Sequence, residues 1–452
     1  MIDPTVQSSA VSERHAAKVA RIVAQLAARR GVRPLSLRKK AVPHQVPKAN
    51  DLRHGDAKID VTELTEILRI DPERRICIAE SGVTFVDLLR ATLAHGLVPN
   101  VFPQLSTITV GGAVSGCSIE AMSFSRGGFH DSCREYEVIT ATGDVLVCTP
   151  DHEHREHRLI FEMMHNSFGT LGILARLTFE LVPAKPYVHL VHETHATVAD
   201  YQAAIRRHAE AGDVDFMDGI IHGPRCYVLC AGRFVDSAPY TSRYDWMKVY
   251  YRSTRTRRED YLRTYDYMLR YDRGVTNVRP GSFVGRLLFG KVMKSTQWLW
   301  LGDKLHRLLR SAKPPVTLDV FVPFPQVPEF MAWFEREIGF FPLWSVPYRA
   351  GSSYPWLADS FWARNRDPLF LDLAIYGMRQ RGDTNYHRLI EQKLLELGGM
   401  KTLISHNYYS EAEFWSIYNK ESYDAVKRIT DPDNQFRDLY EKTCRAAMGR
   451  SS

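Results

Sequence analysis

The sequence has 452 residues, of which 44% are hydrophobic and 25% charged, and this composition is typical of a globular protein with about two or three domains. The net charge of +7 is modest, and the basic clusters at 29–40 and 252–258 lack interleaved aromatic residues, so no nucleic acid is expected as a partner. Seven scattered cysteines without a C-x-x-C pair indicate neither a zinc knuckle nor a disulfide framework, and no metal site is expected. With no signal-peptide pattern and no run of eighteen apolar residues, we expect a cytoplasmic protein.

The first 30 residues are expected to form a separate unit, an amphipathic helix. Apolar side chains between Ala16 and Ala27 recur with the spacing of one helix face and alternate with basic residues. Gly31 and Pro34 would end this helix. The pattern predicts a helix that docks on the protein, and a membrane anchor is the alternative.

The next part of the chain alternates short strands with one helix. Strands are expected at 35–38, 67–70 and 75–80, a polar loop at 41–55, and a hairpin that joins 137–141 to 145–149. The hydroxyl group of Thr84 can cap a helix with Asp87 in its first turn, and Gly96 would end that helix.

From residue 186 onward the pattern changes to apolar runs separated by helices. The runs lie at 214–221, 226–231, 316–322, 341–346 and 370–376, and the helical patterns at 326–337, 387–397, 410–418 and 422–428. Phe436 and Tyr440 are four residues apart, which would place both on one face of a final helix. This order predicts an α+β fold in which an antiparallel sheet with helices on one face forms a substrate domain.

Two glycine-containing segments carry the strongest functional signal. Thr109–Glu120 and Asn166–Ile173 both place paired glycines among small hydroxyl and apolar residues. Backbone N–H groups can then approach an anionic cofactor without interference from side chains. For one glycine pair alone, an ordinary turn or bulge would explain the pattern equally well.

These segments resemble a known flavoprotein superfamily. Pro103–Gly112, Ser115–Glu120, Gly169–Gly172 and Leu181–Tyr187 are similar to the FAD domain of the vanillyl-alcohol-oxidase superfamily, and most similar to its delta-24-sterol reductase family. The resemblance implies a two-subdomain, PCMH-type FAD-binding domain at 31–185. It also implies a substrate domain at 186–452 whose C-terminal helices return to the flavin.

The resemblance also implies which residues face FAD. They are Ser106, Thr107, Thr109, Gly111, Gly112, Ser115, Gly116 and Ser118 in the first motif, and Gly169, Thr170, Gly172 and Ile173 in the second.

The expected phosphate loop departs from the pattern of many superfamily members. The segment 37–56 has a single glycine, Gly55, and neither His44 nor His54 stands in a Gly-His attachment setting. We therefore expect noncovalent FAD. Its phosphate charge would be neutralised in part by basic residues of the loop, which are Lys39, Lys40, Lys48 and Arg53.

Reduction of a carbon–carbon double bond needs a positioned acid as well as a hydride donor. The candidates are His406, Tyr408, Tyr376 and Lys427. If residues 406–409 form a strand, His406 and Tyr408 point to the same face and can reach one pocket. The alternative interpretations are a strand end with polar tips in solvent for His406 and Tyr408, a packed strand aromatic for Tyr376 and a solvated helix residue for Lys427.

The segment 283–309 mixes tryptophans, aliphatic residues and cations, a composition that suits a membrane interface or the mouth of a lipid tunnel as well as a core helix pair. We therefore expect peripheral membrane association through this segment.

The leading functional hypothesis is an FAD-dependent oxidoreductase that reduces a carbon–carbon double bond of a sterol-like or other lipid substrate. NADPH would be a transient reductant, as the resemblance implies, because no separate Rossmann fingerprint is visible. The alternatives are an FAD-dependent oxidase or dehydrogenase of an alcohol or sugar, and a non-catalytic lipid-binding protein on a degenerate flavin fold.

Overall fold

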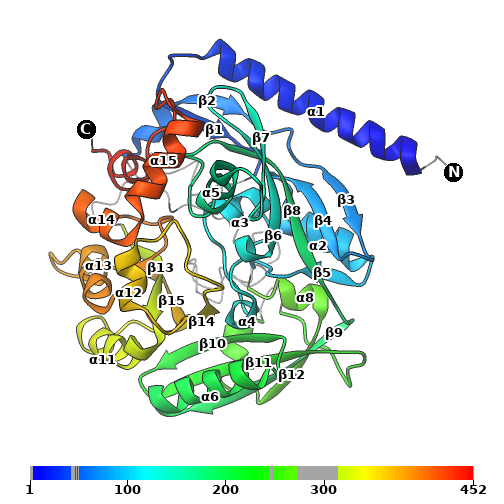
Figure 1. Ribbon diagram of the computed structural model, residues 1–452. Coiled ribbons are helices and arrows are strands. Elements are labelled where there is room, and N and C mark those ends of the chain that lie inside the picture. The colour runs from blue at the N-terminus through cyan, green and yellow to red at the C-terminus, as the bar shows by residue number, and fades with distance from the viewer. Residues whose placement is uncertain are drawn as a thin grey trace, which may run out of the picture.

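A computed structural model describes residues 4–41, 46, 48, 50–244, 248–271 and 314–450. The segment 283–309, with its expected membrane contact, and His44 lie outside the described residues. Figure 1 shows an N-terminal half built on one curved sheet and a C-terminal half built on another, with the long helix α1 along the outer side of the first. Within the described residues, none of the helices combines the length and apolar character needed to span a membrane.

The N-terminal half contains two sheets and five helices that the structure describes. The strands are β1 (Leu35–Arg38), β2 (Ala57–Asp60), β3 (Ile67–Asp71), β4 (Ile76–Glu80), β5 (Leu97–Pro99), β6 (Cys133–Ile139), β7 (Val145–Cys148) and β8 (Ile173–Pro183). The helices are α1 (Pro4–Ala28), α2 (Phe85–Leu93), α3 (Val110–Ser115), α4 (Ser123–Arg126) and α5 (Arg155–Met163). Strands β1 and β2 pair in parallel, whereas β3, β4, β8, β6 and β7 form an antiparallel sheet in that order, with β5 beside β8.

Local sequence signals account for most of these elements. The expected strand pair is β3 with β4, and the expected hairpin is β6 with β7. The hydroxyl oxygen of Thr84 accepts the backbone N–H of Asp87 at the start of α2, as the capping pattern predicted. The amphipathic helix is also confirmed, and it extends over Pro4–Ala28.

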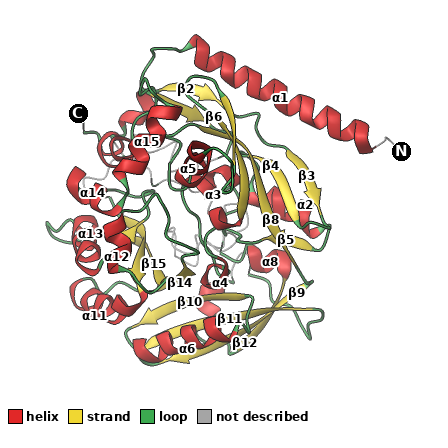
Figure 2. Ribbon diagram, in the orientation of Figure 1, coloured by secondary structure: helices red, strands yellow, loops and turns green. Residues whose placement is uncertain are grey.

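The C-terminal half contains an eight-stranded antiparallel sheet with the order β12-β9-β11-β10-β14-β15-β13-β16 (Figure 2). The strands are β9 (Tyr187–His195), β10 (Phe216–Gly223), β11 (Cys226–Val235), β12 (Glu259–Arg263), β13 (Val316–Pro323), β14 (Leu343–Arg349), β15 (Leu369–Met378) and β16 (Met400–Lys401). The helices are α6 (Val198–Ala211), α7 (Tyr250–Ser253), α8 (Thr264–Met268), α11 (Val327–Glu337), α12 (Asp359–Arg364), α13 (Tyr386–Leu397), α14 (Glu411–Ile417) and α15 (Lys420–Thr430). The α+β class predicted from the sequence is therefore confirmed.

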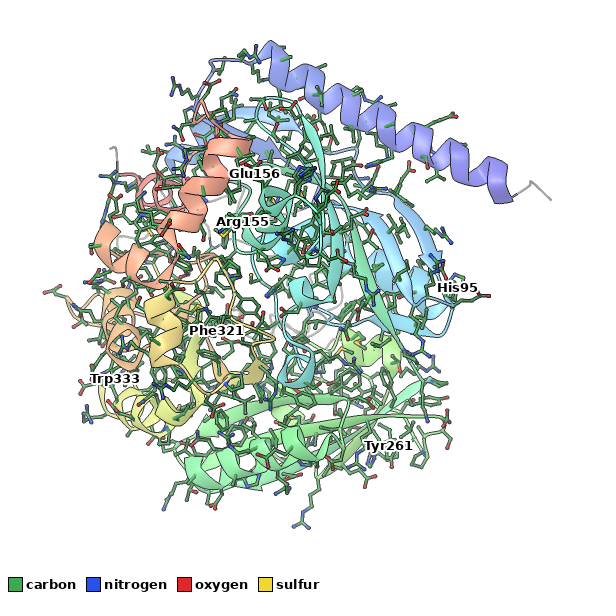
Figure 3. The ribbon with its side chains drawn as sticks, viewed as in Figure 1. His95, Arg155, Glu156, Tyr261, Phe321 and Trp333 are labelled. Atoms are coloured by element: carbon green, nitrogen blue, oxygen red, sulfur yellow. The ribbon has the colours of Figure 1, made fainter. Side chains whose placement is uncertain are left out.

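The two faces of this sheet have different environments because successive residues of a strand point to opposite sides. On β13, Leu318 and Val320 pack in one core with helices α6, α11 and α13, whereas Phe321 packs in the core shared with the N-terminal half. Figure 3 shows Phe321 on this second side and Trp333 among the helices. We call the second side the inner face, since it lies toward the N-terminal half.

The C-terminal segment packs against the N-terminal half, and helix α15 contacts α5 (Figure 1). The expectation of a final helix that carries both Phe436 and Tyr440 is wrong. Phe436 forms a parallel bridge with Leu35 of β1, and the helical turns begin only after it. Pairing with a strand 401 residues earlier in the chain is a tertiary effect that helical spacing cannot reveal.

Helix α1 is held on the N-terminal sheet by a buried ion cluster. The ring of His15 contacts Glu80 and Glu137, each at 2.8 Å, and the ammonium group of Lys18 lies 2.9 Å from Glu80. Burial alone would lower the pKa of His15, but the hydrogen bonds to Glu137 and Glu80 raise it to about 9. The imidazolium form is therefore part of the folded structure at neutral pH.

The first prediction concerns the stability of this contact. Because the folded pKa of His15 exceeds the unfolded value, its contribution is complete below about pH 6.5 and is lost as the pH rises through about 9. His15→Gln should lower the free energy of unfolding by about 1–3 kcal/mol at pH 6 and by little above pH 9. Hydrogen exchange of the α1 amides, measured across this pH range, tests the prediction.

Arg21→Ala is the matched control, because its ion pair with Glu63 is solvent-exposed and should contribute little. Equal protection of α1 in wild type and His15→Gln at pH 6 would contradict the ion-cluster account.

Candidate functional site

The first glycine motif folds into the short helix α3 and the loop after it. The hydroxyl oxygen of Thr109 accepts the backbone N–H of Gly112 at 3.2 Å and caps the helix. Beyond the helix, Cys117 adopts the left-handed conformation with φ of 49°. Non-glycine residues rarely adopt this conformation, and it is concentrated at functional sites.

The second motif docks directly on the first. The backbone N–H of Phe168 donates to the carbonyl of Ser115 at 3.0 Å, and that of Asn166 donates to Val114 at 3.4 Å. Asn166 and Phe168 also have positive φ values, of 55° and 50°. The structure thus brings together two segments that the sequence separates by about fifty residues, and both contain strained backbone.

The glycines of the motifs fall into two groups. A Cβ atom on Gly111 would lie 2.9 Å from the backbone oxygen of Ser81, and one on Gly172 would lie 3.0 Å from the backbone oxygen of Ile139, so packing within the protein requires both glycines. A Cβ on Gly169 would meet only Leu37 at 3.6 Å and the Lys442 ammonium at 3.9 Å. A Cβ at Gly169 would therefore make only ordinary contacts, and one of its neighbours would be the Lys442 ammonium group.

The residues expected to face the cofactor differ in accessibility. Those that are half-buried are Ser106, Thr107, Gly112, Ser115, Gly116, Ser118 and Gly169. Those that are buried are Thr109, Gly111, Thr170, Gly172 and Ile173. The hydroxyl of Thr170 bonds to the carbonyl of Ser167, and the side chain of Ile173 packs in the core under α1. Contact between the half-buried set and a cofactor stays a prediction.

Lys442, which the sequence analysis did not select, lies at the centre of a cationic cluster. Its ammonium group donates to the carbonyl of Phe168 at 2.7 Å. Burial, then the charges of Arg53 and Lys39, lowers the pKa of Lys442 to about 7. Burial and the charge of Arg53 also lower the pKa of Lys48 to about 7. We call Lys39, Lys48, Arg53 and Lys442 the cation set.

Lys39 is exposed to water, and its surroundings lower the pKa of its ammonium group. Its charge in turn lowers the pKa of Lys442. Lys442 lies at the backbone of Phe168 and Gly169, and the charges of Arg53 and Lys39 disfavour its ammonium form although Arg53 is paired with Asp51, so an anion beside Lys442 would be favoured. A pyrophosphate group has the charge and the acceptor oxygens that this arrangement fits.

The expected acid residues His406 and Tyr408 lie together, but not as part of a strand. Residues 402–409 form turns and irregular backbone, so the condition of a strand at 406–409 is not met. Both rings lie against His387 of α13, with centroid distances of 5.1 Å for His406 and 5.9 Å for Tyr408. Burial and the charges of Lys48 and Lys401 lower the pKa of His406 to about 3. A neutral imidazole at physiological pH is poorly suited to donate a proton.

Tyr376 and Lys427, the other two candidates, lie apart from His406 and Tyr408. The hydroxyl of Tyr376 donates to Asp319 at 2.5 Å, from β15 to β13. The ammonium group of Lys427 is buried and donates to the carbonyls of Thr170 and Phe436 and to the carboxylate of Asp431. All three of its protons have internal acceptors, so we assign Lys427 to positioning the second motif and not to proton transfer.

A buried arginine connects the first motif to the C-terminal sheet. Arg270 is 2% exposed, and its guanidinium group lies 2.9 Å from both Glu120 and Asp218. The rings of Tyr267 and Tyr271 flank the guanidinium, and the amide group of Gln104 donates to Glu120 at 2.5 Å. Sequence reasoning missed this network because the partners of Arg270 lie 150 and 52 residues away.

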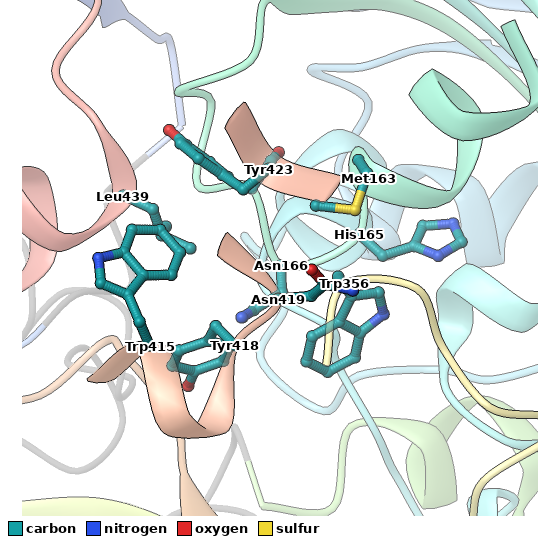
Figure 4. A pocket seen from close by; sticks show the side chains of 10 residues that line it. Met163, His165, Asn166, Trp356, Trp415, Tyr418, Asn419, Tyr423 and Leu439 are labelled. Carbon is teal, nitrogen blue, oxygen red and sulfur yellow. The ribbon is translucent and has the colours of Figure 1, made fainter. Parts of the chain in front are cut away.

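A small pocket lies on the other side of the second motif, between the end of α5 and the C-terminal helices (Figure 4). Its lining residues are Met163, His165, Asn166, Ser167, Trp356, Trp415, Tyr418, Asn419, Tyr423 and Leu439. The space between its atoms is about 230 Å³ including space open to solvent, so the enclosed cavity is smaller than this. It is too small for a whole lipid, since pockets that enclose drug-sized ligands have roughly 300–1,000 Å³.

Comparisons with known proteins agree with a flavin site. Residues 10–149 match the family described as FAD binding domain. A delta(24)-sterol reductase of Homo sapiens is 26% identical over 411 residues, which cover 85% of this chain and 77% of that protein. A delta(24)-sterol reductase homologue of Caenorhabditis elegans is 23% identical over 87% of this chain and 80% of its own. Cytokinin dehydrogenase 7 of Oryza sativa subsp. japonica is 33% identical over 30% of this chain and 26% of its own.

The second prediction tests the role of Gly169. Gly169→Val should greatly reduce flavin binding, because a branched side chain would crowd the Lys442 ammonium group and the backbone expected to contact the cofactor, and the left-handed conformation adds strain of about 1–3 kcal/mol. Gly169→Asn tolerates the conformation but still adds a side chain, so it separates the two effects. The ratio of flavin to protein absorbance after gel filtration gives the occupancy.

Gly223→Val is the control, since no atom lies within 4 Å of a Cβ at that position and its φ is ordinary. Full flavin occupancy in both Gly169 variants would show that Gly169 is an ordinary turn residue.

The third prediction concerns the cation set. Lys442→Met should weaken FAD binding by about 10- to 100-fold, as expected when a hydrogen bond to a charged group of about 1.5–3 kcal/mol is lost. An anionic ligand favours the ammonium form, so wild-type affinity should fall as the pH rises above about 7, and the variant should show a weaker dependence. Titration of the apoprotein with FAD at several pH values measures both effects.

The matched surface variant is Lys420→Met, which removes a half-exposed ammonium group from α15. An equal change in affinity for the two variants would disprove a specific role for Lys442.

Proposed function

We propose that this protein, an FAD-binding oxidoreductase related to the delta(24)-sterol reductases, reduces an isolated carbon–carbon double bond of a sterol-like or other lipid substrate, with NADPH as the electron source. The extent of the similarity carries the proposal. The alignment with the human sterol reductase covers 85% of the chain, so it includes most of the C-terminal sheet and helices as well as the FAD domain. Residues that define a substrate site are expected in that half.

The apolar character of the inner face supports a lipid substrate. Large buried side chains line it, among them Phe321, Tyr348 and Phe370. An apolar environment of this kind suits a hydrocarbon and excludes water, which would otherwise compete for protons and for the reduced cofactor.

The described residues fit the cofactor through their charges and backbone. The cation set would neutralise the pyrophosphate, and the absence of side chains at Gly112, Gly116 and Gly169 would let the cofactor approach the backbone. When bound, FAD supplies a hydride to one alkene carbon after reduction by the nicotinamide. The protein must then orient the alkene, keep water out and supply a proton to the other carbon. Noncovalent binding is proposed because the phosphate loop lacks a Gly-His setting.

The second candidate function is oxidation of a small polar substrate. The similarity to cytokinin dehydrogenase 7 favours it, although that similarity is confined to 139 residues. The two functions differ in how the reduced flavin reacts with air, since an oxidase is reoxidised rapidly by oxygen whereas a reductase needs its alkene.

The fourth prediction tests the reaction. Acid precipitation should leave the flavin in solution, which would establish noncovalent FAD. Under nitrogen, NADPH should reduce the flavin faster than NADH does. A sterol with an isolated side-chain double bond, added afterwards, should reoxidise the flavin and gain two hydrogens by mass spectrometry.

Polyprenyl and unsaturated fatty acyl substrates, run in the same assay, define the lipid class. Rapid reoxidation by air with no turnover of any alkene would contradict the proposal and favour the oxidase. A purified protein without bound flavin that cannot be loaded with FAD would contradict both enzyme functions.

A further inference from the structure

Two carboxyl groups lie side by side on the inner face of the C-terminal sheet. Asp319 of β13 pairs with Ala374, and Asp372 of β15 pairs with Phe321, so the two acids occupy diagonal positions on neighbouring antiparallel strands. Diagonal neighbours on one face of a sheet are close enough to interact. Tyr376, on the opposite diagonal from Asp319, belongs to the same face.

The two acids are both buried but have different partners. Asp319 is 8% exposed, and its carboxyl oxygens accept the hydroxyl of Tyr376 at 2.5 Å and that of Thr402 at 3.4 Å. Asp372 is 2% exposed, and its Oδ1 atom makes no hydrogen bond with any described residue. Two donated hydrogen bonds favour the ionised form of Asp319, whereas an unpartnered buried oxygen favours the neutral acid at Asp372.

Burial and the neighbouring charges also favour a neutral acid at Asp372 more than at Asp319. Burial raises the pKa of Asp319 to about 6. Burial, then the negative charges of Asp319 and Glu120, raises the pKa of Asp372 well above its ordinary value. Two neighbouring buried carboxyls cannot both ionise cheaply, so the pair retains one proton at neutral pH.

The placement of the pair relates it to the cofactor site. Glu120, which acts on Asp372 electrostatically, is the last residue of the first glycine motif. Phe321 and Phe370, the neighbours of the acids along their strands, belong to the apolar core shared by the two halves. An acid proton is thus held in the buried interface between the two halves, the region where the proposed function expects the hydrocarbon substrate.

We propose that Asp372 is the acid that protonates the alkene in the reduction proposed above, and that Asp319 and Tyr376 are the positioning residues that keep its proton in place. The inference rests on the proposed function. In this step the π bond breaks, one carbon takes the proton of Asp372 and the other takes the hydride that originates from NADPH. Asp372 is left as a carboxylate and regains a proton from solvent before the next turnover.

The fifth prediction is that Asp372→Asn, which preserves shape but carries no acid proton, slows flavin reoxidation by the sterol alkene by about 10²- to 10⁴-fold. Reduction of the flavin by NADPH should be unchanged, because that half-reaction does not use the acid. Asp367→Asn is the matched control, since Asp367 precedes β15 and pairs with Arg206 near the surface. Stopped-flow single turnovers under nitrogen measure both half-reactions.

A second measurement does not depend on activity or on bound FAD. Infrared difference spectra of the apoprotein at neutral pH should contain C=O bands of protonated carboxylic acids, to which Glu120 also contributes because burial raises its pKa to about 7. Asp372→Asn should lose the component that belongs to Asp372, and the control Asp367→Asn should keep it. If Asp372→Asn folds poorly, Tyr376→Phe reports on the same pair, because loss of its hydroxyl removes a hydrogen bond that favours ionised Asp319. It should shift the Asp372 component without removing it.

The outcomes separate this inference from the function on which it rests. If wild type reduces the alkene and Asp372→Asn does so at the same rate, the inference is wrong and the function stands. If Asp372→Asn weakens alkene binding but leaves the rate of flavin reoxidation at saturating alkene unchanged, the carboxyl group takes part in substrate binding and is not the acid, so the inference is wrong. If wild type reduces no alkene, both the function and the inference fail.

Discussion

The contact between the two halves depends on the buried guanidinium group of Arg270. Its two carboxylate partners come from different parts of the fold, Glu120 from the end of the first glycine motif and Asp218 from β10. Removing one member of such a buried pair leaves an uncompensated charge and typically costs about 3–5 kcal/mol. The hydroxyl of Tyr271 and the indole N–H of Trp344 also donate to Asp218, which fixes the geometry further. The relative position of motif and sheet is thereby set.

The ion pairs of Arg270 also determine what lies opposite the inner face of the C-terminal sheet. With Glu120 held at the interface, the sheet opposite it presents an apolar surface that contains buried acids. Of the cation set, Lys442 lies near Phe168 and Gly169, where it donates to the backbone of the second motif. Under the proposed function, the cations would hold the charged dinucleotide and the inner face would hold the hydrocarbon part of the lipid.

The sequence predicted the local structure well and the long-range contacts poorly. The capped helix after Thr84 and the hairpin of β6 and β7 follow from short-range signals, and both are present. Phe436 was expected in a helix because its spacing from Tyr440 suited one, but pairing with Leu35 determines its conformation. Arg270 and Lys442 look like ordinary basic residues in the sequence, because their roles arise from partners more than fifty residues away. His406 and Tyr408 were correctly grouped, yet the cations that keep His406 neutral could not be foreseen.

The central claim is that FAD binds along the two glycine motifs, with its phosphates at the cation set and its reactive ring toward the inner face. A crystal structure of the protein grown with FAD is the most direct test. The account predicts pyrophosphate oxygens within hydrogen-bond distance of the Lys442 ammonium and of the backbone at Gly169, and a flavin ring that faces Asp372. A flavin bound away from both motifs, or phosphates remote from Lys442, would contradict it.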